Sequence, residues 1–237
     1  MVTCRISLHG DLPELTGGRR HSLRRLPGPT SAKDALEALG IPHGEVGRIE
    51  VDGALATLAT LIGDGAGVDA WPTEPFPLAQ PRFLCDLHLG KLTRLLRFCG
   101  FDTAWNPTWR EPTLARLAVR NQRTLLSRHR ALLKRSAVSG ALLIRADQAA
   151  HQLAEVLRRY QLTDRISRPG RCTVCNGPLQ ATPKADVPVP IPPRTAAWLD
   201  DYWLCADCGQ LFWEGTHVER LRERIQQAIE RARPDDS

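Results

Sequence analysis

The first part of the chain has a hydrophobic pattern that predicts one small α/β domain. Residues 1–8 alternate apolar with polar side chains, as a half-buried strand does. A helix over 32–39 follows, and Thr30 or Ser31 can cap its first turn. A further strand is predicted over 47–51, and another ends near residue 71. The order strand, helix, strand, strand therefore fills the first part of the chain.

The second part alternates strands and helices. An apolar strand over 82–86 ends in an acid, and a helix over 89–99 follows it. The leucines of this helix share one stripe, while Lys91, Arg94 and Arg97 lie on the opposite, cationic side. The alternation predicts a central parallel α/β sheet. Its other elements are strands over 101–105, 124–127 and 141–144 and helices beginning at Pro112 and covering 148–160.

The pattern divides the chain into three folded parts and a linker. The third part begins near residue 168, contains two cysteine pairs and ends in a helix over 216–231. A proline-rich stretch ending at residue 81 reads as a stiff linker. The boundaries predicted in this way are an N-terminal domain over 1–75, a linker over 76–81, an α/β core over 82–167 and a cysteine-containing module over 168–237.

The composition indicates a folded protein without a membrane span. Apolar residues make up 42% of the chain, but no stretch approaches the run of about 20 apolar residues that crosses a bilayer. The start of the chain lacks the layout of a secretory signal. Seven cysteines, four of them in two Cys-x-x-Cys pairs, favour a reducing compartment, so we expect a cytoplasmic protein. The other three, Cys4, Cys85 and Cys99, are expected to be buried thiols.

The net charge of +6 is concentrated in the middle of the chain. Residues 81–167 carry 16 basic and 6 acidic side chains, whereas 1–80 carry 7 and 10, and 168–237 carry 9 and 10. A basic segment between two near-neutral or acidic ones favours a polyanionic partner, most simply nucleic acid. A solvated basic face without a ligand is the alternative.

The two cysteine pairs have the spacing of a structural zinc site. Each pair, Cys172 with Cys175 and Cys205 with Cys208, places two thiolates at one tight turn. Two such turns can close a tetrahedral site of four sulfurs, which leaves no open position on the metal. We therefore predict one structural Zn²⁺ on these four side chains.

Carboxylates are scarce in the basic segment, so their positions are informative. Asp86 ends the first strand, Glu111 opens a helix, and Asp147 follows a later apolar strand. Acids at the carboxyl ends of parallel strands can converge and bind Mg²⁺ or Mn²⁺. Such ions activate water and neutralise a phosphodiester, which is nuclease chemistry. These acids could instead be helix caps, Glu111 in particular.

A family resemblance supports this interpretation. Residues 81–103 read PRFLCDLHLGKLTRLLRFCGFDT and closely resemble the start of the Mut-seven C-terminal ribonuclease domain family. Further similar stretches are RTLLSR over 123–128, LLIRAD over 142–147 and RCTVCN over 171–176. The resemblance implies a PIN-like nuclease core with an appended zinc ribbon, metal-binding acids at Asp86, Glu111 and Asp147, and RNA, not DNA, as the partner.

The N-terminal part looks like the ubiquitin-like β-grasp domain that often precedes this ribonuclease domain. Residues 40–43, 51–53 and the turn at 64–65 carry the similarity. Such a domain implies a protein partner, which it would bind to direct the rest of the chain.

One position departs from the family pattern. Where the family has an acid after the strand over 124–127, this chain has His129, preceded by Arg128. His129 could replace the missing ligand, favouring Mn²⁺ over Mg²⁺, or act as a general base; a surface or phosphate-contacting histidine is the alternative. The alternative function is a non-catalytic RNA-binding adaptor with a degenerate site. The cations that could hold the RNA backbone, with Lys91 and Arg94 favoured, are Arg82, Lys91, Arg94, Arg97, Arg123, Arg128 and Arg130.

Overall fold

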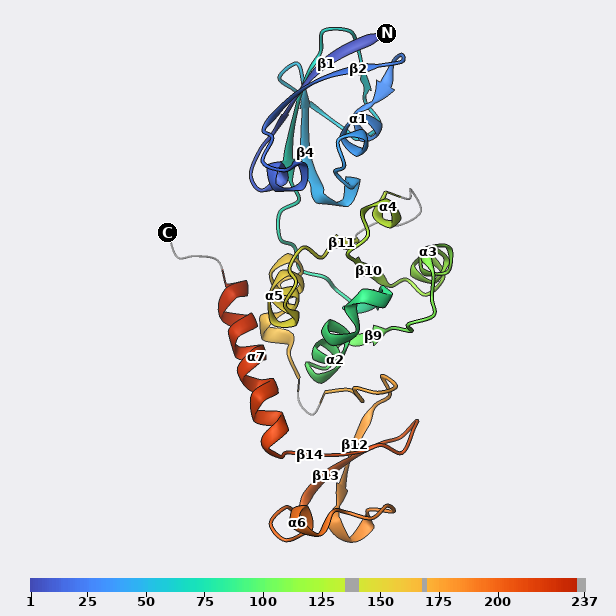
Figure 1. Cartoon of the computed structure of the whole chain (residues 1–237), viewed down its shortest axis with the longest axis vertical. Helices are drawn as coiled ribbons and strands as arrows, with labels where there is room; N and C mark the ends of the chain where they lie inside the picture. Colours follow the sequence, from blue (N-terminus) through green and yellow to red (C-terminus); the bar gives the residue numbers. More distant parts are fainter. Residues whose placement is uncertain (135–140, 168–169, 234–237) are drawn as a thin grey trace. The chain divides into compact units, whose positions relative to one another are not determined.

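The computed structural model of the chain describes residues 1–134, 141–167 and 170–233. The chain forms two compact units (Figure 1). The first consists of Met1–Glu74 and Ser127–Leu143, and the second of Pro75–Leu126 and Ile144–Ser237. Within the described ranges, no helix combines the length and the apolar character that crossing a bilayer requires.

The first unit contains a mixed sheet of five strands in the order β2-β1-β7-β4-β5. Strand β1 (Val2–Leu8) buries every second residue, as its alternating sequence predicts. It pairs antiparallel with β2 (His21–Leu26) and parallel with β7 (Gly67–Pro72). Strand β4 (Val46–Val51) pairs antiparallel with β7 and with β5 (Ala54–Ala56). The first and last long strands thus lie side by side at the centre of the sheet.

Helix α1 (Ala32–Ala38) completes this arrangement. Its cap is Ser31, whose hydroxyl accepts a hydrogen bond from the Asp34 amide at 3.1 Å and satisfies one of the free N–H groups of the first turn. Ala35 and Leu36 are fully buried. The unit has the β-grasp fold, so this part of the predicted architecture is confirmed. Its shorter elements are β3 (Thr30–Ser31), β6 (Leu61–Ile62), α4 (Arg130–Leu133), β11 (Leu142–Leu143) and the 3-10 helices Leu12–Thr16 and His43–Glu45.

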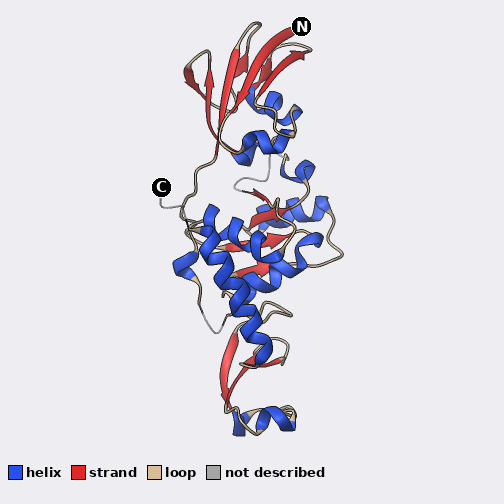
Figure 2. Cartoon of the chain, turned by 60° about the vertical axis from the view of Figure 1, so that its left-hand side comes forward, coloured by secondary structure: helices blue, strands red, loops and turns tan. Residues whose placement is uncertain are grey.

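The second unit is an α/β domain with a central parallel sheet. Strand β8 (Arg82–Cys85) lies between β10 (Thr124–Ser127) and β9 (Asp102–Ala104) and pairs in parallel with both. Within this unit the strand order of the sheet is β10-β8-β9. Residues 83–85 are fully buried, as expected for a strand that is covered on both faces. Figure 2 shows helices around these strands, and they are α2 (Gly90–Phe98), α3 (Glu111–Arg120) and α5 (Ala149–Arg159).

Helix α2 corrects one prediction. Its leucine stripe is buried as predicted, and Gly100, with φ of +94°, allows the turn that follows it. Lys91 and Arg94 are exposed, but Arg97 is only 4% exposed. The prediction that Arg97 belongs to the cationic surface is therefore wrong. The reason is tertiary, because the cysteine module packs over the C-terminal turn of this helix.

The proline-rich segment after the β-grasp fold is bound to α5. The amide of Phe76 donates to the carbonyl of Arg159 at 3.0 Å, and the amide of Leu78 donates to the carbonyl of Tyr160 at 3.3 Å. The rings of Phe76 and Tyr160 also meet edge to face, with 5.4 Å between their centroids. Residues 76–78 are thus fixed to the end of that helix.

The cysteine module forms a three-stranded antiparallel sheet in the order β12-β13-β14. These strands are β12 (Leu179–Pro183), β13 (Asp201–Cys205) and β14 (Leu211–Trp213). The chain then continues into α7 (Thr216–Ala232), which runs beside α5 and buries Ile225 and Ala228 (Figure 1). Shorter elements of this unit are α6 (Pro193–Ala196) and the 3-10 helices Leu87–Leu89, Thr163–Arg165 and Lys184–Asp186.

Candidate functional site

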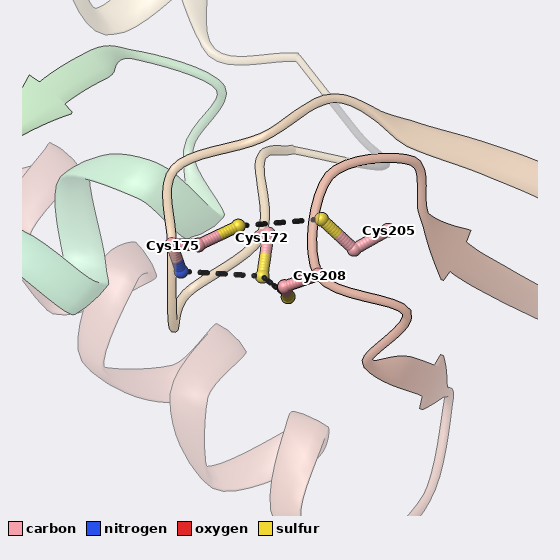
Figure 3. Close-up of side chains that lie close together, drawn as sticks. All are labelled: Cys172, Cys175, Cys205 and Cys208. Atoms are coloured by element: carbon pink, nitrogen blue, oxygen red, sulfur yellow. Dashed lines mark hydrogen bonds between the residues drawn. The ribbon is translucent and has the colours of Figure 1, made fainter.

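The four cysteines of the ribbon converge on one point. Their sulfur atoms all lie within 4.8 Å of one another (Figure 3). The Cys172 and Cys208 sulfurs are 3.7 Å apart, and those of Cys175 and Cys205 are 3.4 Å apart. Disulfide sulfurs would be ~2.05 Å apart, whereas a tetrahedral Zn²⁺ with bonds of ~2.3 Å places its sulfurs ~3.8 Å apart. The geometry therefore fits a single metal ion such as zinc.

Backbone turns hold these sulfurs in place. In the first turn, the Cys175 amide donates to the Cys172 sulfur at 3.4 Å and the Gly177 amide donates to the Cys175 sulfur at 3.3 Å. Asn176 has a φ of +76°, which brings the chain back. Position 177 must be glycine, because a Cβ there would lie 2.9 Å from the Cys205 sulfur. Burial raises the pKa of the Cys172 thiol, so the bare site holds a proton that a metal cation must displace.

Arg97 joins this turn to the α/β core. Its Nη1 atom donates to the carbonyls of Thr173, at 3.1 Å, and Val174, at 2.9 Å, which lie between the first two cysteines. Its Nε atom donates to the carbonyl of Thr103 in β9 at 2.9 Å. Burial lowers the pKa of Arg97, and the nearby sulfurs of Cys172 and other anionic groups raise it. All hydrogen bonds of this buried cation within the described residues end on carbonyl oxygens.

Asp102, at the start of β9, makes a second connection to the same turn. Arg123 binds it with two hydrogen bonds, of 2.8 and 3.1 Å, and Arg82 adds a third of 3.3 Å. Asn176 donates to the same carboxylate at 2.7 Å and accepts from the amide of Thr103 at 2.9 Å. Burial opposes ionisation of Asp102, but the hydrogen bonds from Arg123 and Asn176 outweigh it and hold its pKa at about 2. Arg82 and Arg123 therefore serve this carboxylate, although they were predicted to contact phosphates.

The three predicted metal-binding acids lie at separate element ends in the second unit. Asp86 follows β8, is 3% exposed, and accepts from the His88 amide at 2.8 Å as the cap of the 3-10 helix Leu87–Leu89, so the helix-cap alternative is confirmed for this acid. Glu111 is the first residue of α3 and half-buried; the cap is Arg110, so the helix-cap alternative for Glu111 is wrong. Asp147 is exposed, two residues before α5. Among the described residues, the four cysteines form the one group of three or more metal-ligating side chains that lie close enough to share an ion. The three acids do not lie that close to one another.

Comparison with known protein families shows the family to which the chain belongs. Residues 81–225, which include the parallel sheet, the three acids and all four cysteines, match the model described as the Mut7-C RNase domain. The chain belongs to the Mut7-C RNase domain family. The residues before this domain, 7–76, match the Mut7-C ubiquitin model, in agreement with the β-grasp fold.

Solved structures resemble the ubiquitin-like part of this Mut7-C protein. The Haloferax volcanii small archaeal modifier protein 1 is 20% identical, with a TM-score of 0.27, and the match covers 30% of this chain and 98% of the modifier. A Pyrococcus furiosus protein assigned as a molybdopterin converting factor subunit 1 is 17% identical, with a TM-score of 0.26, and the match covers 30% and 98% of the two chains. None of the curated proteins matches the chain.

The remaining predicted residues of the Mut7-C site divide between the two units. Lys91 and Arg94 are exposed on α2, in the unit that holds the three acids. Arg128 and His129 are exposed at the start of α4, in the segment that groups with the β-grasp unit. His129 is the N-cap residue of that short helix, and its amide donates to the Ser127 hydroxyl at 2.9 Å.

One carboxylate and one amide side chain of the Mut7-C domain, which the sequence analysis did not predict, bind the backbone of the loop before α5. Glu155 accepts from the Arg145 amide at 3.0 Å and from the Ala146 amide at 2.9 Å. Gln152 donates to the Ala146 carbonyl at 2.9 Å. These contacts fix the loop that ends in Asp147. Only the fold shows which backbone groups Gln152 reaches. Burial of Cys4, Cys85 and Cys99 is confirmed, and burial raises the pKa of Cys85 to about 12.

Proposed function

We propose that this protein is a divalent-metal-dependent ribonuclease that hydrolyses phosphodiester bonds in RNA. The observation that carries the proposal is the match of residues 81–225 to an RNase domain family, with Asp86 buried at the carboxyl end of a parallel strand. The crevice outside the carboxyl ends of such strands is where α/β sheets bind ligands.

Asp86, Glu111 and Asp147 all belong to the same compact unit, and although they are not gathered closely enough in this structure to share an ion, we propose that they close on the divalent ion when it binds. When bound, Mg²⁺ or Mn²⁺ supplies an activated water and neutralises charge on the phosphodiester. Lys91 and Arg94 would bind phosphates of the RNA next to the cleaved bond. Glu155 and Gln152 keep the loop of Asp147 in place through its backbone. His129 is proposed as a further ligand or general base, and Arg128 as a further phosphate contact.

The decisive experiment compares Asp86→Asn with Asp164→Asn. Asp164 is an exposed acid of the same unit, so its variant controls for the loss of one charge. Both proteins are incubated with single-stranded RNA in Mg²⁺ and, separately, in Mn²⁺. Loss of an outer-shell partner of a metal typically lowers activity ~10–100-fold. We expect Asp86→Asn to lower the rate of RNA cleavage by more than this, and Asp164→Asn to cleave like wild type. Unchanged cleavage by Asp86→Asn contradicts the assignment.

We further propose that the cysteine site holds one structural Zn²⁺. Four thiolates complete the tetrahedral shell, so no position remains for substrate. The two turns belong to different parts of the ribbon, so the metal would fix its fold. Elemental analysis of the purified protein should give one zinc per chain, and replacing Cys172 and Cys208 by serine should release it. Full zinc content in that double variant contradicts the site.

The second candidate function is a non-catalytic RNA-binding adaptor. It is favoured by His129 at the position where the family carries an acid. Wild-type protein that binds single-stranded RNA but leaves it intact in both Mg²⁺ and Mn²⁺ would establish the adaptor and exclude the hydrolase. A third proposal, that the β-grasp domain binds a protein partner, is compatible with either, and deletion of residues 1–75 tests it through the proteins that no longer co-purify.

A further inference from the structure

An aromatic pocket lies where the ribbon meets helix α2. Phe98 from α2, Leu179 from β12, Trp203 from β13, and Phe212 and Trp213 from β14 form its apolar lining. It encloses about 490 Å³ of space, the open mouth included. All five side chains are half-buried. Asp86, Glu111, Asp147 and the four cysteines do not line this pocket; its further lining residues are Gly170, Arg171, Thr173, Glu214 and Val218.

The sheet register explains why two of the rings share one wall. Trp203 and Phe212 are direct partners in the antiparallel pair of β13 and β14, and side chains of such partners project from the same face of a sheet. Phe98 completes the pocket from the last turn of α2. Aromatic side chains that line a pocket suit a planar ligand, because every nucleobase has a π-face that can stack on them.

A cationic path leads to the pocket along α2. Lys91, Arg94 and Phe98 are spaced i, i+3 and i+7, so they lie on one face of the helix. Both cations are exposed, and neither forms an ion pair within the described residues. The helix begins four residues after Asp86, and Lys91 and Phe98 are ~10 Å apart along its axis. One face thus runs from the proposed cleavage site, past two phosphate-binding groups, to the aromatic rings.

We propose that this pocket receives one unpaired base of single-stranded RNA whose phosphates lie on Lys91 and Arg94. The inference rests on the proposed RNA substrate and adds the position of one base relative to the cleaved bond. An apolar peptide would use the rings but not the cations, and a duplex would keep its bases stacked within the helix. A flexible anionic strand with exposed planar bases uses both features.

Binding is measured with the full chain carrying Asp86→Asn, zinc-loaded and without added divalent ions. The probes are a single-stranded uridine hexanucleotide and the same ribose-phosphate chain without bases. The protein has six tryptophans, which are labelled with 5-fluorotryptophan and assigned by single Trp→Phe variants. We expect the hexanucleotide to shift the ¹⁹F resonances of Trp203 and Trp213. The resonance of Trp198, which is 62% exposed and outside the pocket, should not move. The abasic chain should shift neither the Trp203 nor the Trp213 resonance.

Substitutions give the matched test of affinity. Trp203→Leu and Phe98→Leu keep apolar volume but remove the aromatic face, and each should lower the affinity for the hexanucleotide on the order of 10-fold. The control Trp198→Leu should bind like wild type. For the cationic path, Lys91→Ala and Arg94→Ala should weaken both probes, whereas Arg116→Ala, an exposed arginine on α3, should weaken neither. Thermal melting of every variant separates lost contacts from lost folding.

The outcomes distinguish this proposal from the proposed hydrolase. Equal affinity for the base-bearing and abasic chains, or an unshifted Trp203 resonance at saturation, overturns the base pocket. A Trp203 shift caused by a leucine-rich peptide but not by the hexanucleotide makes the pocket a protein-docking site and also overturns it. Base-dependent binding by a wild-type protein that does not cleave RNA upholds the pocket and refutes only the hydrolase.

Discussion

The replacement Arg97→Met tests how the ribbon is coupled to the α/β core. Arg97 is 4% exposed and makes three hydrogen bonds, to the carbonyls of Thr103, Thr173 and Val174. Hydrogen bonds from a charged donor contribute ~1.5–3 kcal/mol each, so their loss costs at least ~4 kcal/mol. Methionine recovers part of this because it need not be desolvated as a cation. We expect the free energy of unfolding to fall by ~2–4 kcal/mol, measured by urea denaturation.

The same replacement should weaken metal binding. Arg82 and Arg123 bind the carboxylate of Asp102, and Arg97 and Arg171 interact with it electrostatically, so in the described part of the chain four guanidinium groups share this one carboxylate and leave an excess of positive charge. A zinc ion on four thiolates carries two negative charges and would balance most of this excess. Removing Arg97 therefore removes a counter-charge of the proposed centre. We expect the zinc affinity to fall ~10–100-fold, as for other outer-shell partners, in competition with a chromogenic chelator.

Two matched variants separate charge from geometry. Arg97→Lys keeps the charge but replaces the planar fork by one ammonium, so it should restore zinc affinity more than stability. Arg94→Met changes an exposed arginine on the same helix and should alter neither quantity by more than ~0.5 kcal/mol. Wild-type zinc affinity in Arg97→Met would show that the guanidinium does not balance the metal centre, and wild-type stability would show that it does not dock the ribbon.

Four further results are expected. Gly170→Ala should destabilise the second unit by more than ~2 kcal/mol, because a Cβ there would lie 2.2 Å from the Phe98 carbonyl oxygen, whereas Gly28→Ala, with open space around it, should not. Asp102, with a folded pKa of about 2 against 3.8, stabilises the fold above pH ~4 and loses this as the pH falls towards 2, so the stability difference from Asp102→Asn should vanish in acid urea titrations. Glu155→Ala frees the loop before α5 and should raise the Mn²⁺ concentration for half-maximal cleavage ~10-fold; an unchanged value excludes a positioning role. A plot of the logarithm of RNA affinity against the logarithm of salt concentration should have a slope near −2, because only a few surface cations neutralise phosphates and displace their counterions. A slope near −7 would mean that all the excess positive charge of the basic segment contacts phosphates.

Local signals in the sequence were sufficient for much of the fold. The alternation over Val2–Leu8 determines which faces of β1 are buried, and Ser31 caps α1 through its own side chain, so both could be predicted from neighbouring residues. The cysteine site could be predicted because two Cys-x-x-Cys turns leave few other arrangements of four thiols. The domain boundaries and the ligand roles of the three acids stay predictions, and among the described residues these acids are not gathered around one point.

Long-range contacts explain what local patterns missed. A helical wheel shows that Arg97 lies away from the leucine stripe, but the groups that bury it are carbonyls 76 and 77 residues later in the chain. Asp102 looks like an ordinary acid in the sequence; its role depends on Arg123 and Asn176, which are 21 and 74 residues away. Phe98 and Trp203 likewise form one pocket only after the ribbon has packed on α2.

These contacts change the meaning of the basic segment. Its excess of positive charge indicates a polyanionic ligand, but Arg82, Arg97 and Arg123 are used inside the protein, where the ribbon docks on the core. Their anionic partners are one carboxylate, the carbonyl oxygens of the first turn and the proposed tetrathiolate centre, not phosphates. What remains for a ligand within the second unit is a narrower surface, in which Lys91 and Arg94 lie between Asp86 and the aromatic pocket. A strand bound there is oriented by few charges, so the aromatic rings must contribute a large share of any preference for unpaired RNA.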